Sequence, residues 1–305
     1  MSAAGEPSVS VVIPTRDRPE LLRRALEAIL SQSYGEIECL VVFDQAEPSL
    51  PEVRVPDGHT VRALVNERSP GLAGARNTGA LAAAGDLVAF CDDDDEWLPD
   101  KLRLQIATKE RLGTTVVSSG IYVRYRDREV ERAPVGEMVT FEDLLRSRRM
   151  EIHPSTFLMD RDALLHSIGL VDEEIPGSYA EDYEWLLRAA RTGGIATVQA
   201  PLVRVLWHDS SFFTARWDMI ISALTYLLEK YPEFGGEPVG LARIYGQISF
   251  AHAAAGRRGE ARAWARRALR FDPRQRRAYL ALLVSSGWVS PDAVRRVAHR
   301  FGRGI

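Results

Sequence analysis

The chain has 305 residues, of which 46% are hydrophobic and 27% are charged, and this composition excludes wholesale disorder and a collagen-like repeat. Its length favours two domains, or one large domain with an appendage. The only cysteines, Cys39 and Cys91, lie in apolar runs, which excludes a disulfide framework and favours a reducing compartment. Residues 1–8 lack the pattern of a secretory signal, and the apolar runs are shorter than a membrane span. A cytoplasmic protein is expected.

Charge is distributed unevenly along the chain. Residues 241–305 contain 14 arginines and three acidic residues, whereas residues 1–240 carry a net charge of −14. Several of the arginines recur at helical spacing: Arg257, Arg258, Arg262, Arg266, Arg267 and Arg270. A solvated helix face is the favoured interpretation, with docking to an acidic face of the main domain, a partner subunit or anionic lipid left open. The helix itself shows no strong apolar membrane-binding face.

The first half of the chain alternates between apolar runs and helical patterns. Residues 8–13, 37–43, 61–65 and 87–91 have strand character. Pro14 is expected to stop the first strand, and Asp17 with Glu20 forms a candidate capping box for a helix that continues to residue 30. A second helix is expected over 72–84. This alternation predicts a doubly wound, mainly parallel sheet whose ligands bind at the carboxyl ends of the strands.

The pattern then becomes mixed. It predicts helices over 99–112, 142–149 and 182–192, strands over 115–123, 155–159 and 196–206, and a polar turn over 126–131. Beyond about residue 210 only helical periodicity remains, so we expect an α/β domain over residues 1–215 and a helical region over 216–305. The helical region resembles part of a tetratricopeptide array, through Tyr245, Ile248, Ala261, Ala268 and Pro273.

Five consecutive acidic residues, from Asp92 to Glu96, follow the fourth predicted strand. Carboxylates crowded in this way repel one another unless protons or a cation intervene. Oxygen ligands suit Mg²⁺ or Mn²⁺ better than zinc. A solvated acidic turn ahead of a helix is the alternative, but a strand end in a doubly wound sheet is where a metal bridges a bound diphosphate.

Ordered motifs identify a resemblance to the family 2 glycosyltransferases of the GT-A fold, over about residues 8–210. Residues 10–15 (Ser-Val-Val-Ile-Pro-Thr) resemble the opening strand of the family, and residues 41–44 (Val-Val-Phe-Asp) its second strand. Residues 71–79 resemble the donor-side loop and helix, residues 92–95 the Asp-x-Asp metal motif, and residues 181–188 the acidic motif that supplies the base. One departure is Phe43, where the family often has an acid.

The resemblance implies roles for individual residues. Asp182 would act as general base, with Glu181 beside it, and Asp94 would bind the metal. Donor-nucleotide binding would involve Pro14, Thr15, Asp44, Arg76, Asp92 and Asp93. His208 follows the last predicted strand, where some related enzymes have a residue near the metal or diphosphate, and is a second candidate ligand. His153 is interpreted as a turn histidine, and Asp95 as a residue that supports the structure.

The resemblance therefore implies a metal-dependent inverting glycosyltransferase. It would use Mn²⁺ or Mg²⁺ and a nucleotide-sugar donor, with UDP favoured and TDP or GDP left open. The acceptor would be a carbohydrate, a lipid-linked sugar or a small molecule. The enzyme would be cytoplasmic, with a peripheral position at the inner membrane face as the alternative. A homo-oligomer formed through the C-terminal helices is left open, and nucleic acid is excluded because the larger domain is acidic and no binding motif is present.

Two other functions compete with this one. A sugar-nucleotidyltransferase is expected to carry a Gly-rich triphosphate loop after the first strand, but residues 14–19 contain no glycine. A noncatalytic scaffold that binds partners through its helical C-terminus is the other alternative. Retention of both Asp94 and Asp182 favours an enzyme.

Overall fold

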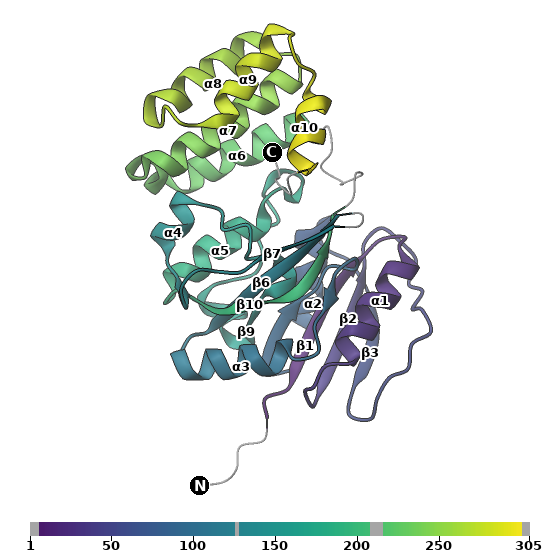
Figure 1. Cartoon of the computed structure of the whole chain (residues 1–305). Helices are drawn as coiled ribbons and strands as arrows, with labels where there is room; N and C mark the ends of the chain where they lie inside the picture. The colour runs from purple at the N-terminus through teal and green to yellow at the C-terminus, as the bar shows by residue number, and fades with distance from the viewer. Residues whose placement is uncertain (1–5, 126–127, 208–215, 301–305) are drawn as a thin grey trace. The chain divides into compact units, whose positions relative to one another are not determined.

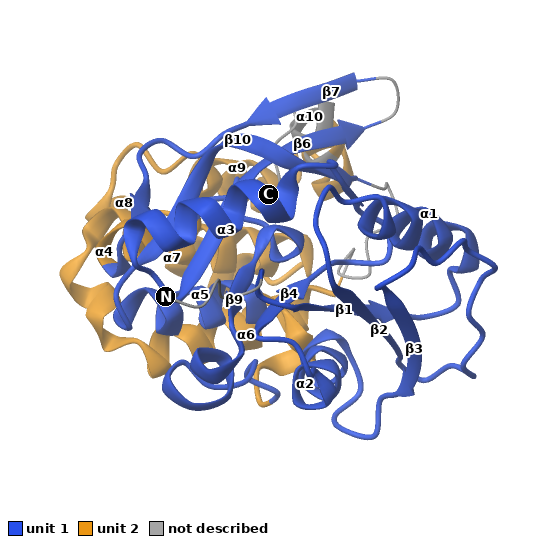
Figure 2. Ribbon diagram, turned by 90° about the horizontal axis from the view of Figure 1, so that it is seen from below, with its two compact units in different colours: residues 1–141, 149–173, 181–207 blue, residues 142–148, 174–180, 208–305 orange. Residues whose placement is uncertain are grey.

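The computed structural model describes residues 6–125, 128–207 and 216–300 of the chain (Figure 1). The chain divides into two compact units (Figure 2). The first unit comprises residues 1–141, 149–173 and 181–207, and the second comprises residues 142–148, 174–180 and 208–305. The expected division after residue 215 did not include the two short segments that join the helical unit.

The first unit is built on a ten-stranded sheet whose main path runs β3-β2-β1-β4-β9-β6-β10-β5, with β7 and β8 at its margins. The strands are β1 Val9–Thr15, β2 Ile37–Phe43, β3 Thr60–Val65, β4 Leu87–Phe90, β5 Glu96–Trp97, β6 Val116–Tyr125, β7 Arg128–Arg132, β8 Met138–Val139, β9 Leu158–Asp160 and β10 Ile195–Leu206. The first four strands pair in parallel, and β9 runs antiparallel to both β4 and β6.

Helices cover both faces of this sheet because successive side chains of its buried strands point in opposite directions. On one face, Val11 and Ile13 of β1 pack in a cluster with Leu26 of α1 (Pro19–Leu30). On the other face, Gly79 of α2 (Leu72–Ala82) approaches Val12 so closely that an added Cβ would lie 2.2 Å from Val12 Cγ1. Helices α3 (Lys101–Leu112) and α5 (Glu181–Arg191) complete the unit. The predicted doubly wound, mainly parallel α/β fold is confirmed.

Two details near the end of β1 differ from the sequence-based expectation. Pro14 lies inside β1, opposite Val42, because its nitrogen points to the β4 side, where pairing has already ended at Val12. The expected capping box of Asp17 and Glu20 was wrong, since α1 has Arg18 at its N-cap and no side-chain cap bond. Pro19 determines this start, because its fixed φ suits the first helical position and shifts the helix away from Asp17.

Two further expectations need correction in the mixed part of the sheet. The predicted polar turn over 126–131 is largely strand β7, which pairs with β6; residues 126–127 lie outside the described part. The predicted strand over 155–159 begins with a 3₁₀ turn, Pro154–Thr156, and only then becomes β9. Pro154 favours this turn because its ring supplies the φ of a helical first position.

The second unit is helical in its described part. Its elements are α6 Trp217–Lys230, α7 Pro238–Ala254, α8 Arg258–Phe271, α9 Arg276–Ser286 and α10 Pro291–Arg300, and most of α4 (Phe141–Arg146) joins them. Small residues let the helices approach closely: Ala265 and Ala268 of α8 cluster with Ala278 of α9. The C-terminal helical appendage that the sequence predicted is therefore present. None of the helices in the described residues combines the length and hydropathy needed to span a membrane.

Candidate active site

The candidate site lies where the strand order reverses. From β1 the chain proceeds through β2 and β3 on one side, whereas β4 pairs on the other side of β1, and Figure 2 shows these strands side by side. The carboxyl ends of β1 and β4 therefore border the crevice in which open α/β sheets bind ligands. Thr15 ends β1, and the four aspartates of residues 92–95 follow β4.

Arg76 of α2 joins the acidic loop to α5 at the centre of this site. Its side chain is only 2% exposed. Nη2 donates to Asp92 Oδ1 at 2.7 Å, and Nη1 donates to Glu181 Oε1. Burial opposes the charged form of Arg76, but the Asp92 and Glu181 carboxylates more than offset it and raise the pKa of the guanidinium. Arg76 is thus a permanent cation between two predicted site carboxylates.

Glu181 has the opposite balance. Burial raises the pKa of its carboxyl to about 7, against the lowering effect of Arg76 and with a further increase from Asp182. Asp182 lies half-buried in the first turn of α5, and its charge also contributes to the raised pKa values of Arg76 and His153. The two acids that open α5 therefore lie within electrostatic range of the acidic loop.

The middle aspartates of the loop are tied to the end of β1. Thr15 Oγ1 donates to Asp93 Oδ2 at 2.7 Å, and Arg18 Nη1 donates to Asp93 at 3.2 Å and Asp94 at 3.0 Å. Burial and the neighbouring aspartates nevertheless raise the pKa of Asp94 to about 8. The loop thus holds more negative charge than Arg18 neutralises, which is the condition that favours a bound cation.

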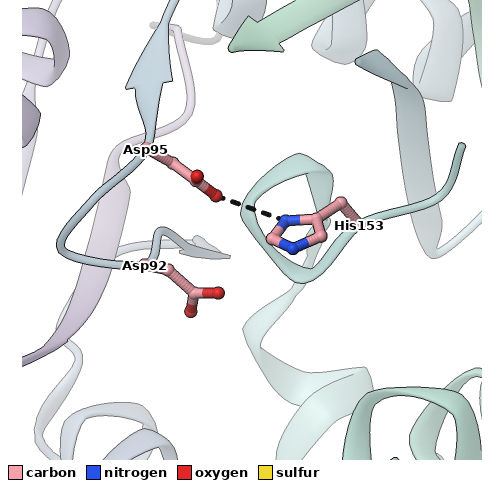
Figure 3. A group of neighbouring side chains, drawn as sticks. All are labelled: Asp92, Asp95 and His153. Carbon is pink, nitrogen blue, oxygen red and sulfur yellow. Dashed lines mark ion pairs between the residues drawn. The ribbon is translucent and has the colours of Figure 1, made fainter. Parts of the chain in front are cut away.

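Asp92, Asp95 and His153 form a second group of potential ligands. Each offers one ligand atom, and these atoms lie within 4.8 Å of one another. Asp95 points at the His153 ring, with 3.3 Å between Oδ2 and Nδ1 (Figure 3). Burial opposes protonation of His153, but the Asp95 carboxylate prevails and raises the histidine pKa to about 9. A metal at this group would therefore have to displace a proton.

Ser155 connects the same group to the backbone of the loop. Its Oγ donates to Asp95 Oδ2 and accepts from the Asp92 amide at 2.9 Å. Asp95 Oδ1 also accepts from the Leu206 amide at 3.3 Å, so this carboxylate holds the loop, the 3₁₀ turn and β10 together. The sequence pattern predicts a supporting role for Asp95 and a turn position for His153. Their ion pair and the hydrogen bonds of Ser155 have no signal in the sequence.

Asp44 organises a different loop, at the end of β2. Its carboxylate accepts hydrogen bonds from Asn66 Nδ2 at 2.7 Å and from the Gly71 amide at 3.0 Å. Gly71 has φ 113°, a conformation that disfavours any side chain. Sequence reasoning missed Asn66, for which the only signal was an amide residue directly after a strand.

The remaining motif residues fix the position of α5. Trp185 stacks on Phe157, with ring centroids 5.5 Å apart, and Arg188 donates to the carbonyls of Ile168 and Leu170 and to Glu184. Through these contacts Trp185 and Arg188 hold α5 in place, and with it Glu181 and Asp182 in its first turn. His208, the second predicted metal ligand, lies outside the described residues.

Comparisons with known proteins identify the family and the fold. The model of a family described as glycosyl transferase family 2 matches residues 10–165. The chain is 25% identical over 196 residues to the UDP-Glc:alpha-D-GlcNAc-diphosphoundecaprenol beta-1,3-glucosyltransferase WfgD of Escherichia coli, covering 64% of this chain and 74% of that protein. It is 29% identical over 172 residues to the amylovoran biosynthesis glycosyltransferase AmsB of Erwinia amylovora, covering 51% and 56%, respectively.

Two solved structures resemble the whole chain. S. aureus TarS 1–349 in complex with UDP-GlcNAc has a TM-score of 0.59 at 16% identity, covering 97% of this chain and 92% of that one. The mannosyltransferase PcManGT from Pyrobaculum calidifontis in complex with GDP-Man and Mn²⁺ has a TM-score of 0.54 at 17% identity, covering 92% and 86%. At these identities the likeness concerns the fold, and it confirms the expected GT-A architecture.

Proposed function

The chain belongs to glycosyltransferase family 2 and is a nucleotide-sugar glycosyltransferase, and from that premise we propose that it is a metal-dependent inverting enzyme with Asp182 as general base. One observation carries the proposal. Arg76 binds Asp92 of the acidic loop and Glu181 of α5 at the same time. This buried bridge supports the proposal because it holds the acidic loop next to α5, the helix with the proposed base.

Asp182 would accept the proton of the acceptor hydroxyl, a role that requires hydrogen-bond reach. As the proton leaves, the acceptor oxygen attacks the anomeric carbon from the face opposite the diphosphate. The new glycosidic bond forms while the bond between the anomeric carbon and the diphosphate oxygen breaks, and its electron pair leaves with the diphosphate. A single displacement of this kind inverts the anomeric configuration.

The residues of the acidic loop suit a divalent cation. Asp94 is half-buried among carboxylates, with its pKa raised to about 8, and Asp92 and Asp95 offer further oxygens close to the His153 nitrogen. When bound, the cation would supply positive charge for the departing diphosphate. We propose Asp94 as ligand, together with His208, and keep the Asp92, Asp95 and His153 group as the alternative set. A carboxylate set with one imidazole suits Mn²⁺ at least as well as Mg²⁺.

Thermal stabilisation provides the first test, because a ligand that binds the native state raises the unfolding temperature according to its affinity. UDP, TDP and GDP would each be tested with and without Mn²⁺. We expect UDP to stabilise the protein only with the metal, since WfgD uses UDP-Glc by its name and TarS was solved with UDP-GlcNAc. No shift with any nucleotide would contradict the proposed donor site.

Two substitutions distinguish the proposed ligand sets. If Asp94 binds the metal, Asp94→Asn abolishes the Mn²⁺-dependent part of the UDP stabilisation, whereas His153→Gln retains most of it. The opposite result would assign the metal to the Asp92, Asp95 and His153 group. Unchanged Mn²⁺ dependence in both variants would exclude both assignments.

The nature of the acceptor is proposed from the named relatives. WfgD is named for transfer to a sugar linked to diphosphoundecaprenol, and AmsB for amylovoran biosynthesis. We propose a sugar acceptor of this kind, carried on a lipid diphosphate. Transfer from UDP-[¹⁴C]glucose to a synthetic GlcNAc-diphospholipid, compared with free GlcNAc, would test it, and equal rates on both acceptors would exclude lipid recognition.

A further inference from the structure

Helix α8 of the second unit carries a row of four arginines at every fourth position: Arg258, Arg262, Arg266 and Arg270. All four are exposed. Side chains four residues apart lie on the same side of a helix, and like charges at this spacing repel each other. Within the described residues none of the four forms an ion pair. We call this row the arginine row; it extends over about 18 Å of the helix.

The neighbouring helix α9 exposes apolar side chains instead. Tyr279 is 48% exposed and Leu283, four residues later, is 42% exposed. Trp288 is 84% exposed and follows Gly287, which ends α9 in a left-handed conformation with φ 86°. A tryptophan so exposed is unusual, because its large ring is normally buried against other groups. These residues, Tyr279, Leu283 and Trp288, form the apolar row.

The helices that carry the two rows pack against each other. Ala265 and Ala268 of α8 pack with Ala278 of α9, and Leu269 and Leu282 border this contact. At the other end of α9, a Cβ added to Gly287 would lie 3.7 Å from Arg258 Nη2. The start of α8 therefore lies beside the end of α9, and Figure 1 shows the two helices next to each other. The helix that carries the arginine row thus lies beside the helix that carries the apolar row, and Arg258 lies near Gly287, the residue before Trp288.

We propose that the exposed arginines of α8 and the exposed apolar residues of α9 face the same side and together form a surface that binds an anionic lipid bilayer. Charge supports the choice, because residues 257–290 contain nine arginines and only two acidic residues. A bilayer surface presents lipid phosphates above an apolar interior, and arginine binds phosphate in a fixed, two-pronged geometry. Tryptophan and tyrosine favour the boundary between head groups and acyl chains. A bilayer offers charged phosphates to the arginine row and an apolar interior to the apolar row.

The sequence argued against membrane binding because the arginine-rich helix lacks a strong apolar face. In the structure, α8 alone likewise exposes no such face beside its charges. The apolar residues come from α9 and the turn after it, and α9 packs against α8 only in the folded unit. The inference goes beyond the proposed glycosyl transfer and does not depend on it.

The test is flotation of the full chain with vesicles of phosphatidylcholine, alone or with about one third phosphatidylglycerol. We expect binding only to the anionic vesicles, weakened by salt because screening shortens the reach of exposed charges. The triple variant R262Q/R266Q/R270Q should lose at least about tenfold in vesicle affinity. A matched control, R24Q/R54Q/R128Q, removes three exposed arginines of the first unit and should stay within about twofold of the wild type.

The apolar row should contribute to binding independently of charge. Trp288→Ser should lower the affinity severalfold and leave the slope of affinity against salt unchanged, because it removes no charge. UDP stabilisation measured in every variant shows whether the first unit remains folded, so failure of this inference is separable from failure of the proposed function. Equal binding by the arginine-row variant and its control would overturn the inference.

Two other partners would be recognised in the same experiments. If light scattering shows an oligomer that the R262Q/R266Q/R270Q variant loses, and vesicles are not bound, the surface is an interface between copies of this chain. If a DNA oligonucleotide binds more tightly than the anionic vesicles, the surface is a general polyanion site. Either result would overturn assignment to a bilayer.

Discussion

At the candidate site the first unit buries charged groups and pairs them, whereas α8 of the second unit exposes arginines in a row without ion pairs among the described residues. Arg76 and Arg266 illustrate the difference. Arg76 is 2% exposed and held by two carboxylates, so its contribution depends on exact geometry. Arg266 is exposed, so its contribution depends on the summed field and on salt. Substitutions at the candidate site should therefore affect chemistry and stability, and those on α8 should affect association.

The largest effect is expected for the proposed base. Asp182→Asn keeps the shape of the side chain but cannot accept the acceptor proton, so kcat should fall about 100- to 10,000-fold. Stabilisation by UDP and Mn²⁺ should change little. Initial rates of sugar transfer, together with thermal shifts of the same preparation, measure both properties. Wild-type turnover in this variant would exclude Asp182 as the base.

Breaking the buried bridge should have the next largest effect. Arg76→Met leaves the Asp92 and Glu181 carboxylates in a buried site without their cation, and removal of one partner from such a pair costs about 3–5 kcal/mol. Urea unfolding measures the loss, and Arg24→Met, at an exposed position of α1, is the control with a change expected below about 0.5 kcal/mol. Equal losses in the two variants would show that the bridge contributes nothing particular to stability.

The fold was predictable because its central strands are continuous apolar runs. Such a run indicates a buried strand from its own sequence, without knowledge of the strand it pairs with. Strand β7 was missed because its five residues, Arg128–Arg132, are mostly charged and exposed. It joins the sheet through backbone pairing with β6, which leaves no periodic pattern in the sequence. Its assignment as a turn followed from polarity, which does not distinguish an exposed edge strand from a loop.

The candidate site was predictable only in part, for a related physical reason. The aspartates of residues 92–95 are recognisable in the sequence because acids rarely cluster directly after a buried strand. Their partners Arg18, Ser155 and His153 come from other parts of the chain, and nothing local to them indicates the contact. Asp95 contacts His153 only because the 3₁₀ turn at Pro154 brings the histidine to the loop.

A second buried basic residue of the first unit, Lys101, has no carboxylate partner like those of Arg76 in the described part of the chain. Lys101 is fully buried, donates to Gln105 at 2.7 Å and lies 3.7 Å from the centre of the Trp97 ring. Burial lowers its pKa to about 7. Between pH 7 and the ordinary lysine pKa the unfolded chain binds the additional proton, so the stability of the folded state should rise with pH.

Lys101→Met removes the titrating amine, so the free energy of unfolding should rise less steeply with pH. Relative to wild type, the variant should gain roughly 2–4 kcal/mol at pH 6 and lose that advantage progressively above pH 7. The free energy of unfolding in urea, measured between pH 6 and 9, tests the sign. Lys230→Met, at an exposed position of α6, should leave the wild-type slope intact. A wild-type slope in Lys101→Met would mean that the buried lysine stays charged throughout.

The smallest expected effect tests packing inside the second unit, where apolar and small residues rather than charges hold the helices. Gly240 of α7 lies against the segment 142–148, and an added Cβ would lie 1.8 Å from the Leu145 carbonyl oxygen. Because that oxygen belongs to the backbone, Gly240→Ala forces a helix shift and should cost about 1–3 kcal/mol.

Gly259, in α8, has nothing within 4 Å of an added Cβ, so Gly259→Ala should be neutral or stabilise the protein by up to about 1 kcal/mol. Thermal unfolding of both variants provides the comparison, and the arginine row is unaltered in each. A stable Gly240→Ala protein would show that segment 142–148 does not pack tightly against α7. If Gly240→Ala is destabilised while vesicle binding persists, the lipid-binding surface depends on its own rows of side chains rather than on the whole unit.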